Sequence, residues 1–228
     1  MHTQPHEAVP QWLRPLSELI NQPNQRFLCH PADGSSTAQW VAHVTSTLGA
    51  PASAADMALL HEQLGENAPQ AFIDFYTHYN GAELYADTVE HNAIGIHAVG
   101  IRVFAIAMWE RMGDYFQDWI DGEVFDAGEL NARVPPWAHE AVMFGEVPNS
   151  GNYFLLALGG AQHGGIYYFD QDGLNFSLYA ASLPEFFQRI TSDPVQALND
   201  LGGYARYGDD ATGTQWMPQV YAAGDAVF

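Results

Sequence analysis

Apolar residues recur every three to four positions between residues 53 and 81, and this spacing predicts two consecutive helices. Ser53 is suited to cap the first helix, which we expect to end at Gly65. Pro69 suits the first turn of the second helix, and Asn80-Gly81 stops it. The apolar faces consist of Met57, Leu59, Leu60 and Leu64 in the first helix and Phe72, Ile73, Phe75, Tyr76 and Tyr79 in the second. Two such faces need a broad surface to cover, and a β-sheet provides one most simply.

The sheet is predicted from short runs rich in aliphatic and aromatic residues, separated by Gly, Asn and Pro. The later runs follow one another closely, which is typical of an antiparallel meander, and Asp170-Gln171-Asp172-Gly173 turns the chain into the last of them. These runs span residues 93–99, 101–104, 141–147, 153–158, 165–169 and 175–179.

Three further helices are predicted in the second half of the chain. Helical spacing covers residues 105–120, and Asp121-Gly122 interrupts it. Ser182 and Glu185 form a capping box, so we expect a helix over residues 182–191. Asp193-Pro194 then starts a short helix that ends near Leu201.

The first fifty residues are interpreted as an extension packed on the main domain. Residues 1–10 form a loose tail, and residues 11–21 form a short helix. Trp40, Val44 and Leu48 lie four positions apart, which predicts a second helix. Residues 204–228 lack clear periodicity. We therefore divide the chain into a helical extension (1–50), an α+β domain with a mixed or largely antiparallel sheet flanked by helices (51–203), and a C-terminal tail (204–228).

Composition indicates a folded and strongly acidic protein. The chain has 228 residues, of which 47% are hydrophobic, so it has ample material for a core. It carries 27 acidic residues against seven basic ones, all arginine, for a formal net charge of -20. That charge disfavours nucleic acids and anionic membrane surfaces as ligands and favours a basic protein partner. An acidic surface can also serve solubility alone.

Several kinds of chemistry are excluded or disfavoured. Schiff-base catalysis and the P-loop both need a lysine, which this chain lacks. The single cysteine, Cys29, cannot form an internal disulfide, and no run resembles a signal peptide or membrane span, so we expect a cytoplasmic protein. Ten histidines occur without metal-ligand spacing, and we expect no metal and no cofactor.

A loop that resembles a calcium site and the pairs of neighbouring carboxylates both have simpler explanations. The segment from Asp170 to Asn175 has the alternating carboxylates of a calcium loop, but Ala181 stands where the bidentate Glu is needed, so we interpret it as a hairpin turn. No nucleophile-elbow motif is present, and neighbouring carboxylates such as Asp114 and Asp118 are typical of a hydrated helix face. We therefore assign no catalytic residue.

The densest charge lies between residues 110 and 129, where seven acidic residues stand against Arg111 alone. Aromatic residues are interleaved with these acids, and buried aromatic anchors dominate the energetics of many interfaces. Two interpretations remain open: the segment docks a basic protein, or its rings face the core and its carboxylates are simply hydrated. Under the first, the partner-binding residues are Trp109, Glu110, Asp114, Tyr115, Asp118, Trp119, Asp121 and Glu123.

The order of motifs resembles that of the SUKH superfamily, known for a fungal cell-wall assembly regulator and for bacterial immunity proteins. The resemblance covers roughly residues 53–200. It includes Phe144-Gly145, Tyr167-Tyr168-Phe169-Asp170 and the segment from Ser182 to Phe187. Ala68, Phe72 and Ala82 stand where the family more often has Leu, Tyr and Gly, which weakens assignment to a subgroup. The residues of this chain that match the opening motif of the superfamily are Glu62, Gly65, Pro69, Phe72, Asn80 and Gly81.

The resemblance implies an α+β fold and a non-enzymatic binding role. Combined with the charge, it favours an immunity protein that neutralises a basic toxin, such as a nuclease, by binding it. A regulatory binding module without a toxin partner is the alternative, and a small hydrolase whose residues converge only in space is a third.

Overall fold

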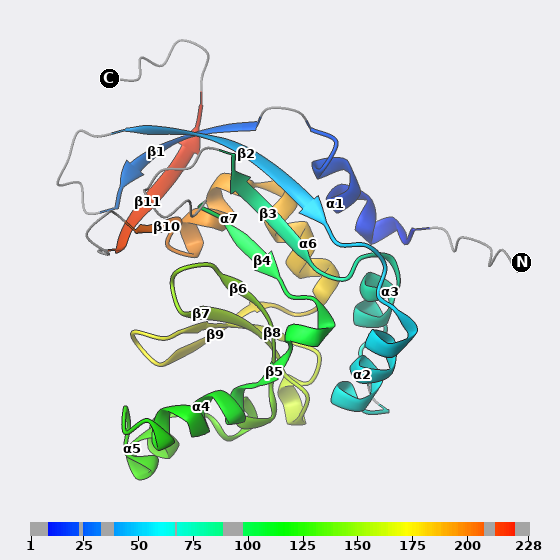
Figure 1. The fold of residues 1–228 in the computed structure, drawn as a ribbon, viewed down its shortest axis with the longest axis vertical. Coiled ribbons are helices and arrows are strands. Elements are labelled where there is room, and N and C mark those ends of the chain that lie inside the picture. The colour runs from blue at the N-terminus through cyan, green and yellow to red at the C-terminus, as the bar shows by residue number, and fades with distance from the viewer. Residues whose placement is uncertain are drawn as a thin grey trace, which may run out of the picture.

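The computed structural model describes residues 9–22, 25–32, 39–66, 68–88, 98–207 and 213–221. Within these ranges an antiparallel sheet runs through the molecule in the order β10-β11-β1-β2-β3-β4-β6-β7-β8-β9, and the short β5 also pairs with β6 (Figure 1). The strands are β1 (Gln25–Pro31), β2 (Trp40–Leu48), β3 (Ala82–Asp87), β4 (Ile101–Val103), β5 (Glu110–Arg111), β6 (Val142–Val147), β7 (Asn152–Leu156), β8 (Ile166–Asp170), β9 (Asn175–Ala180), β10 (Tyr204–Tyr207) and β11 (Gly213–Val220).

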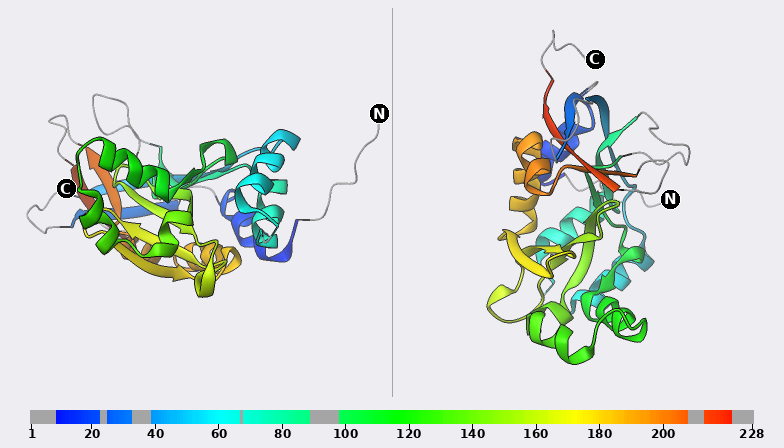
Figure 2. Two further views of the ribbon diagram at one scale, coloured as in Figure 1. Left: turned by 90° about the horizontal axis from the view of Figure 1, so that it is seen from below. Right: turned by 90° about the vertical axis from the view of Figure 1, so that its left-hand side faces the viewer.

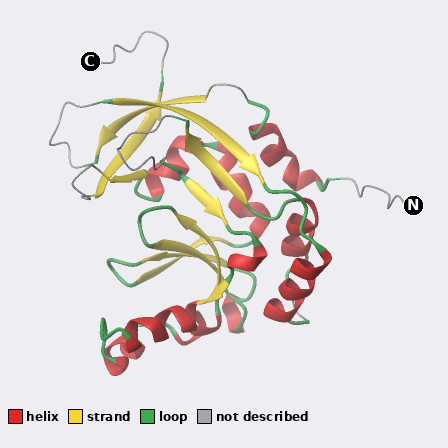
Figure 3. Ribbon diagram, in the orientation of Figure 1, coloured by secondary structure: helices red, strands yellow, loops and turns green. Residues whose placement is uncertain are grey.

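Helices flank this sheet, which confirms the predicted α+β class and the N-terminal helix (Figure 3). The α-helices are α1 (Arg14–Leu19), α2 (Ala54–Leu64), α3 (Gln70–His78), α4 (Met112–Asp121), α5 (Ala127–Arg133), α6 (Leu183–Ser192) and α7 (Pro194–Asp200). Short 3-10 helices are η1 (Gln11–Leu13), η2 (Ile106–Met108), η3 (Pro136–Glu140) and η4 (Gly160–Gln162).

Two hydrophobic cores lie on opposite faces of the sheet. Val142 and Phe144 of β6 belong to the larger core with residues of α1, α2, α3, α6 and α7, whereas Met143 between them belongs to a smaller core beneath α4 and α5. This division follows from the two-residue period of a strand, which points successive side chains to opposite faces. Figure 2 shows α4 and α5 apart from α6 and α7. The strands β6 to β8 therefore have both faces buried.

The two tandem helices and their end signals are confirmed. Ser53 caps α2 in a capping box with Asp56, and Gly65 follows its last residue. Pro69 occupies the N-cap position of α3, one residue earlier than a first-turn proline. Gly81 has a φ of 97°, a backbone conformation that favours glycine. The predicted meander is present as β6 to β9, and Ser182 caps α6.

The predicted helix through Trp40, Val44 and Leu48 is wrong, because these residues lie in β2. A spacing of four is also an even spacing, so it fits one face of a strand as well as one face of a helix. Ala42 completes the buried row with Trp40 and Val44, and the β-branched residues between them favour a strand. Residues 25–48 thus contribute two strands to the sheet.

The predicted helix over residues 105–120 is replaced by η2, β5 and then α4, which begins only at Met112. The backbone of Trp109 is extended, and its indole is buried in the larger core. Because this ring is held in the larger core, the chain has to cross to the other face of the sheet, and α4 begins only after that crossing. Apolar residues keep a helical spacing on both sides of this crossing, so the sequence pattern did not show where α4 begins.

The C-terminal segment contributes β10 and β11, which its sequence did not predict. β11 pairs with β1, and Trp216 packs edge-on against Trp40 at 5.9 Å between ring centroids. The predicted strand over residues 93–99 lies mostly outside the described residues. The boundaries at residues 50 and 203 remain predictions, although the sheet includes strands on both sides of each.

Tyr76 connects α3 to the segment that precedes α4. Its hydroxyl donates to the Phe104 carbonyl at 2.7 Å and accepts from Trp109 Nε1 at 3.1 Å. Burial raises the pKa of this hydroxyl, partly offset by the Trp109 hydrogen bond, so it stays protonated. The pair holds Trp109 inside the core and thereby sets where the chain leaves for α4.

We predict that Tyr76→Phe lowers the free energy of unfolding by about 2–4 kcal/mol, because two buried polar groups lose their partner. Urea denaturation with an unchanged m-value is the measurement. Tyr167→Phe is the matched control, since no hydrogen bond of the Tyr167 hydroxyl occurs among the described residues, and it should change stability by less than about 0.5 kcal/mol. Equal effects of the two changes would contradict this role of Tyr76.

We further predict that Gly81→Ala destabilises the fold more than Gly65→Ala. Both glycines have positive φ, which strains any other residue. A Cβ at Gly81 would lie 2.8 Å from the Val103 carbonyl oxygen, whereas one at Gly65 would meet no atom within 4 Å. Thermal unfolding of the two variants checks the order, and an equal loss would contradict it.

Candidate functional site

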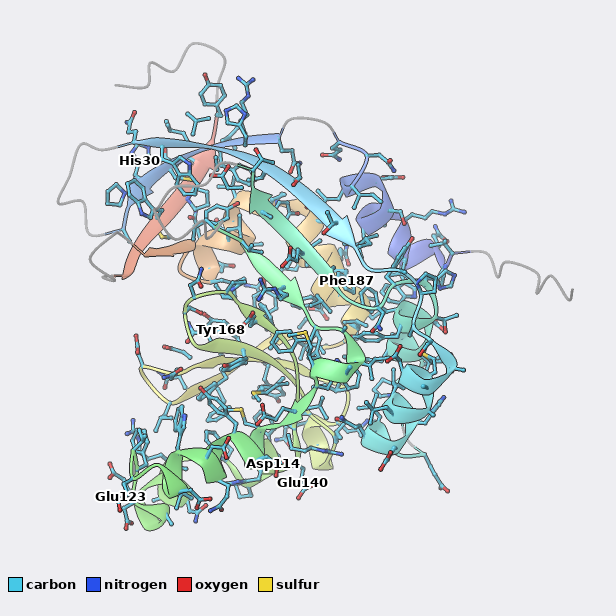
Figure 4. The ribbon with its side chains drawn as sticks, in the orientation of Figure 1. His30, Asp114, Glu123, Glu140, Tyr168 and Phe187 are labelled. Atoms are coloured by element: carbon cyan, nitrogen blue, oxygen red, sulfur yellow. The ribbon has the colours of Figure 1, made fainter. Side chains whose placement is uncertain are left out.

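The candidate site is the exposed side of α4 and the loop that leads to α5. Met112 and Phe116 are buried in the smaller core, while Asp114, Asp118 and Asp121 are exposed. This separation follows from the helical period, because residues three to four apart share a face. Figure 4 shows Asp114 and Glu123 at opposite ends of this helix on the periphery of the molecule.

The structure exposes the acidic residues of the predicted set but not all of its aromatic residues. Glu110, Asp114, Asp118, Asp121 and Glu123 are exposed. Tyr115 and Trp119 are half-buried. Trp109 is only 7% exposed, so the folded state leaves little of its ring for a partner, and its assignment as a partner-binding residue stays a prediction. Its ring stabilises the larger core.

Three of the carboxylates repel one another. Partial burial raises the pKa of Glu110, and the negative charges of Asp118 and Asp114 raise it further. Across the described residues, no ion pair includes any of the seven acids between positions 110 and 129. Two of them have local roles, since Asp126 caps α5 and Asp121 accepts from the Gln117 amide. The surface therefore carries negative charge that no ion pair within the described ranges neutralises.

Arg111 does not relieve this charge. Its guanidinium donates to the backbone carbonyls of Glu140, at 2.6 Å, and Gln63. These bonds connect β5 to the end of α2 and to η3. The arginine closest in sequence to the acidic helix therefore serves a structural purpose.

The half-buried rings of Tyr115 and Trp119 anchor α4 and remain partly exposed. Tyr115 packs against Trp119 at 5.0 Å and against Tyr153 of β7 at 5.3 Å between ring centroids. Trp119 stacks on Phe125 at 5.4 Å. The rings thus pack inward, as the second interpretation expects, while docking of a basic protein by this segment stays a prediction.

Sequence reasoning missed an in-register polar row on the adjoining sheet. Glu83, Arg102, Glu146 and Tyr153 lie opposite one another on β3, β4, β6 and β7. Arg102 Nε donates to Glu83 Oε1 at 3.0 Å, and Arg102 Nη1 donates to Glu146 Oε1 at 2.5 Å. Strand pairing creates this row from residues far apart in the sequence, so no local pattern could reveal it.

The structure also exposes two apolar side chains near the acids. Met108 of η2 is 57% exposed, and Val124 in the loop after α4 is 63% exposed. Isolated apolar side chains are common on surfaces. Val124 follows Glu123 in the sequence and Met108 lies two residues before Glu110, a combination that also occurs in interfaces that join charge with apolar contact.

The opening motif has a structural role. Asn80 Oδ1 accepts the Ile106 backbone N–H at 2.9 Å, and the Asn80 amide donates to Asp56 at 3.4 Å. Phe72 is buried against Trp109 and Phe144, while Glu62 is exposed on α2. Asn80 and Phe72, together with Gly65, Pro69 and Gly81, thus fix α2 and α3 on the sheet.

The described side chains form no cluster suited to metal binding, and the segment that resembles a calcium loop is a turn. Throughout the described ranges, no three His, Cys, Asp or Glu side chains gather as metal ligands, and His91 and His97 lie outside those ranges. The turn at Asp170 is a hairpin turn between β8 and β9, in which the Asp172 N–H donates to the Asp170 carboxylate at 3.2 Å. The described helices include none long and apolar enough to cross a bilayer.

Comparison with known proteins connects this geometry to a family. A search of curated proteins gives no match to the chain. The family model described as SMI1/KNR4 (SUKH-1) matches residues 51–189, which is more than half of the chain and includes α2 to α5, β3 to β9 and most of α6. The resemblance inferred from the motifs is thereby confirmed, and the chain belongs to the SMI1/KNR4 family (SUKH-1).

Proposed function

We propose that this protein is a non-enzymatic immunity protein that binds a basic toxin through the acidic surface of α4 and the following loop. Membership of the SUKH family supports a protein-binding role. The observation that carries the proposal is the set of exposed carboxylates on α4 that no ion pair within the described part of the chain neutralises.

In the proposed mechanism, carboxylates of this protein take the place of the phosphates that the toxin normally binds. The Lys and Arg side chains with which a nuclease-type toxin holds phosphates can bind carboxylates instead, in charge-assisted hydrogen bonds. Tyr115 and Trp119 supply a partly apolar floor at which water can be excluded. The toxin's substrate surface is then covered, and no catalytic group of this protein is needed.

Long-range attraction adds to these contacts. A formal net charge of -20 raises the rate of encounter with a cationic protein, and salt screens this effect. Binding should therefore weaken as ionic strength rises. A regulatory partner would use the same surface, so the identity of the captured protein distinguishes the two roles.

We predict that reversing Asp114, Asp118 and Asp121 together to lysine weakens partner binding at least about tenfold, because each lost charge pair contributes up to about 1 kcal/mol. The measurement is affinity capture from the native cell at low and high salt, followed by titration with the captured protein. The captured protein should be basic.

The matched control reverses Glu62, Glu66 and Asp172, which are exposed and lie outside α4. It changes the net charge by the same amount. Equal weakening by both triple variants would show that only overall charge matters, and unchanged affinity of the α4 variant would overturn the proposed surface.

We predict that Glu110→Gln stabilises the free protein by about 0.5 kcal/mol at pH 7, the size of an exposed charge interaction. The raised pKa of Glu110 means that the folded state favours its protonated form. The protonated side chain therefore contributes its full stabilisation at pH values below the pKa that Glu110 has in the unfolded chain. This stabilisation is lost as the pH rises through the pKa that Glu110 has in the folded protein. The gain from glutamine should thus vanish near pH 3.5. Urea denaturation at the two pH values, with Glu66→Gln as control, measures it, and a gain independent of pH would contradict this origin.

A further inference from the structure

A pocket of about 450 Å³ opens where β2 and β4 end and β3 begins. Its lining combines polar groups with apolar side chains, among them Leu48, Asn80, Glu83, Arg102, Phe104 and Met108. Met108 is exposed at 57%, and the side chain of Glu83 is exposed at 46%. The pocket thus offers a carboxylate together with apolar contacts, which is the combination that a long cationic side chain needs.

The charges around the pocket do not balance. Arg102 is shared between Glu83 and Glu146, and in both contacts the carboxylate uses only its Oε1 atom. In the part of the chain that the structure describes, the Oε2 atoms of both glutamates accept no hydrogen bond. Two carboxylates therefore share one guanidinium, and a second cation would complete the pairing.

The pocket is continuous with the acidic surface of α4. Met108 lies two residues before Glu110, whose charge interacts with those of Asp114 and Asp118. On the sheet, Tyr153 stands opposite Glu146 and packs against Tyr115 of α4. Burial raises the pKa of Tyr153 most, Tyr115 raises it further, and the negative charges of Glu146 and Glu110 add smaller increases. A protein bound on α4 therefore extends readily to the pocket.

We propose that the pocket where β2 and β4 end and β3 begins receives a lysine or arginine side chain of the basic partner. The charged head pairs with Glu83, and the aliphatic stem packs against Met108. This assignment rests on the proposed function and extends the binding surface from α4 onto the sheet. It makes Glu83 and Met108 determinants of specificity, whereas α4 supplies attraction to basic proteins in general.

The first test uses small probes and does not require the partner. Protein labelled with ¹³C at the methionine methyl groups is titrated with N-acetyl-arginine amide, N-acetyl-lysine amide and the neutral N-acetyl-citrulline amide. The Met108 methyl, assigned with Met108→Leu, is the reporter among six methionines, and Met217 of β11 is the internal reference. We expect saturable shifts at Met108 with the two cations and none with citrulline.

Two variants should change the affinity for the cationic probes in opposite directions. Glu83→Gln should weaken binding of the cationic probes about threefold to fivefold, as for a partly exposed ion pair. Arg102→Met should tighten it about threefold, because both carboxylates lose their internal cation. Asp172→Asn is the control for loss of a remote carboxylate, and thermal unfolding confirms that each variant is folded. Absent Met108 shifts, equal shifts with citrulline, or weaker binding by a folded Arg102→Met variant would overturn the proposal.

The second test separates this proposal from the proposed function. Glu83→Gln and Met108→Gln are titrated with the captured partner beside the α4 triple reversal. Weakening by all of these changes supports both proposals. Weakening by the α4 reversal alone would overturn the pocket assignment and leave the immunity surface intact, and no effect of the α4 reversal would overturn the proposed function.

Discussion

The alternation of side chains along a single antiparallel sheet is the constraint on which this structure depends. In β6, Phe144 faces the larger core and Met143 faces the smaller one, so these central strands must be covered on both sides. Helices α6 and α7 help to cover one side, and α4 and α5 cover the other. No residue of β1 to β4 belongs to the smaller core, among the residues that the structure describes.

This unequal coverage decides where the proposed binding surface lies. α4 has to bury Phe116 against Phe169, so its carboxylates necessarily point outward. The helix stops short of β3 and β4, and the polar row of Glu83, Arg102 and Glu146 remains beside it. Apolar packing thus creates an acidic helix and a partly neutralised sheet face side by side. Repulsion among the carboxylates is tolerated because burial of the rings beneath them outweighs it.

The hydrogen bond between Tyr76 and Trp109 lies between the acidic helix α4 and the helices that cover the larger core. It holds the segment before α4, which consists of η2 and the extended Trp109, against the larger core, and Asn80 binds the Ile106 N–H nearby. Met108 is consequently left exposed at the mouth of the pocket, and Glu110 begins the acidic surface. The family motif at Asn80-Gly81 therefore shapes the candidate site without taking part in any chemistry.

The sequence alone determined the tandem helices, the meander, the helix caps and the acidic character of residues 110–129, because each depends on local spacing or composition. It did not determine that Trp40 and Val44 lie in a strand, since an even spacing fits both periods. Nor did it place Trp109 in the core, or bring Glu83, Arg102 and Glu146 into one row. Those outcomes depend on strand register and on which face each helix covers, and such long-range pairings are decided only when the whole chain packs together.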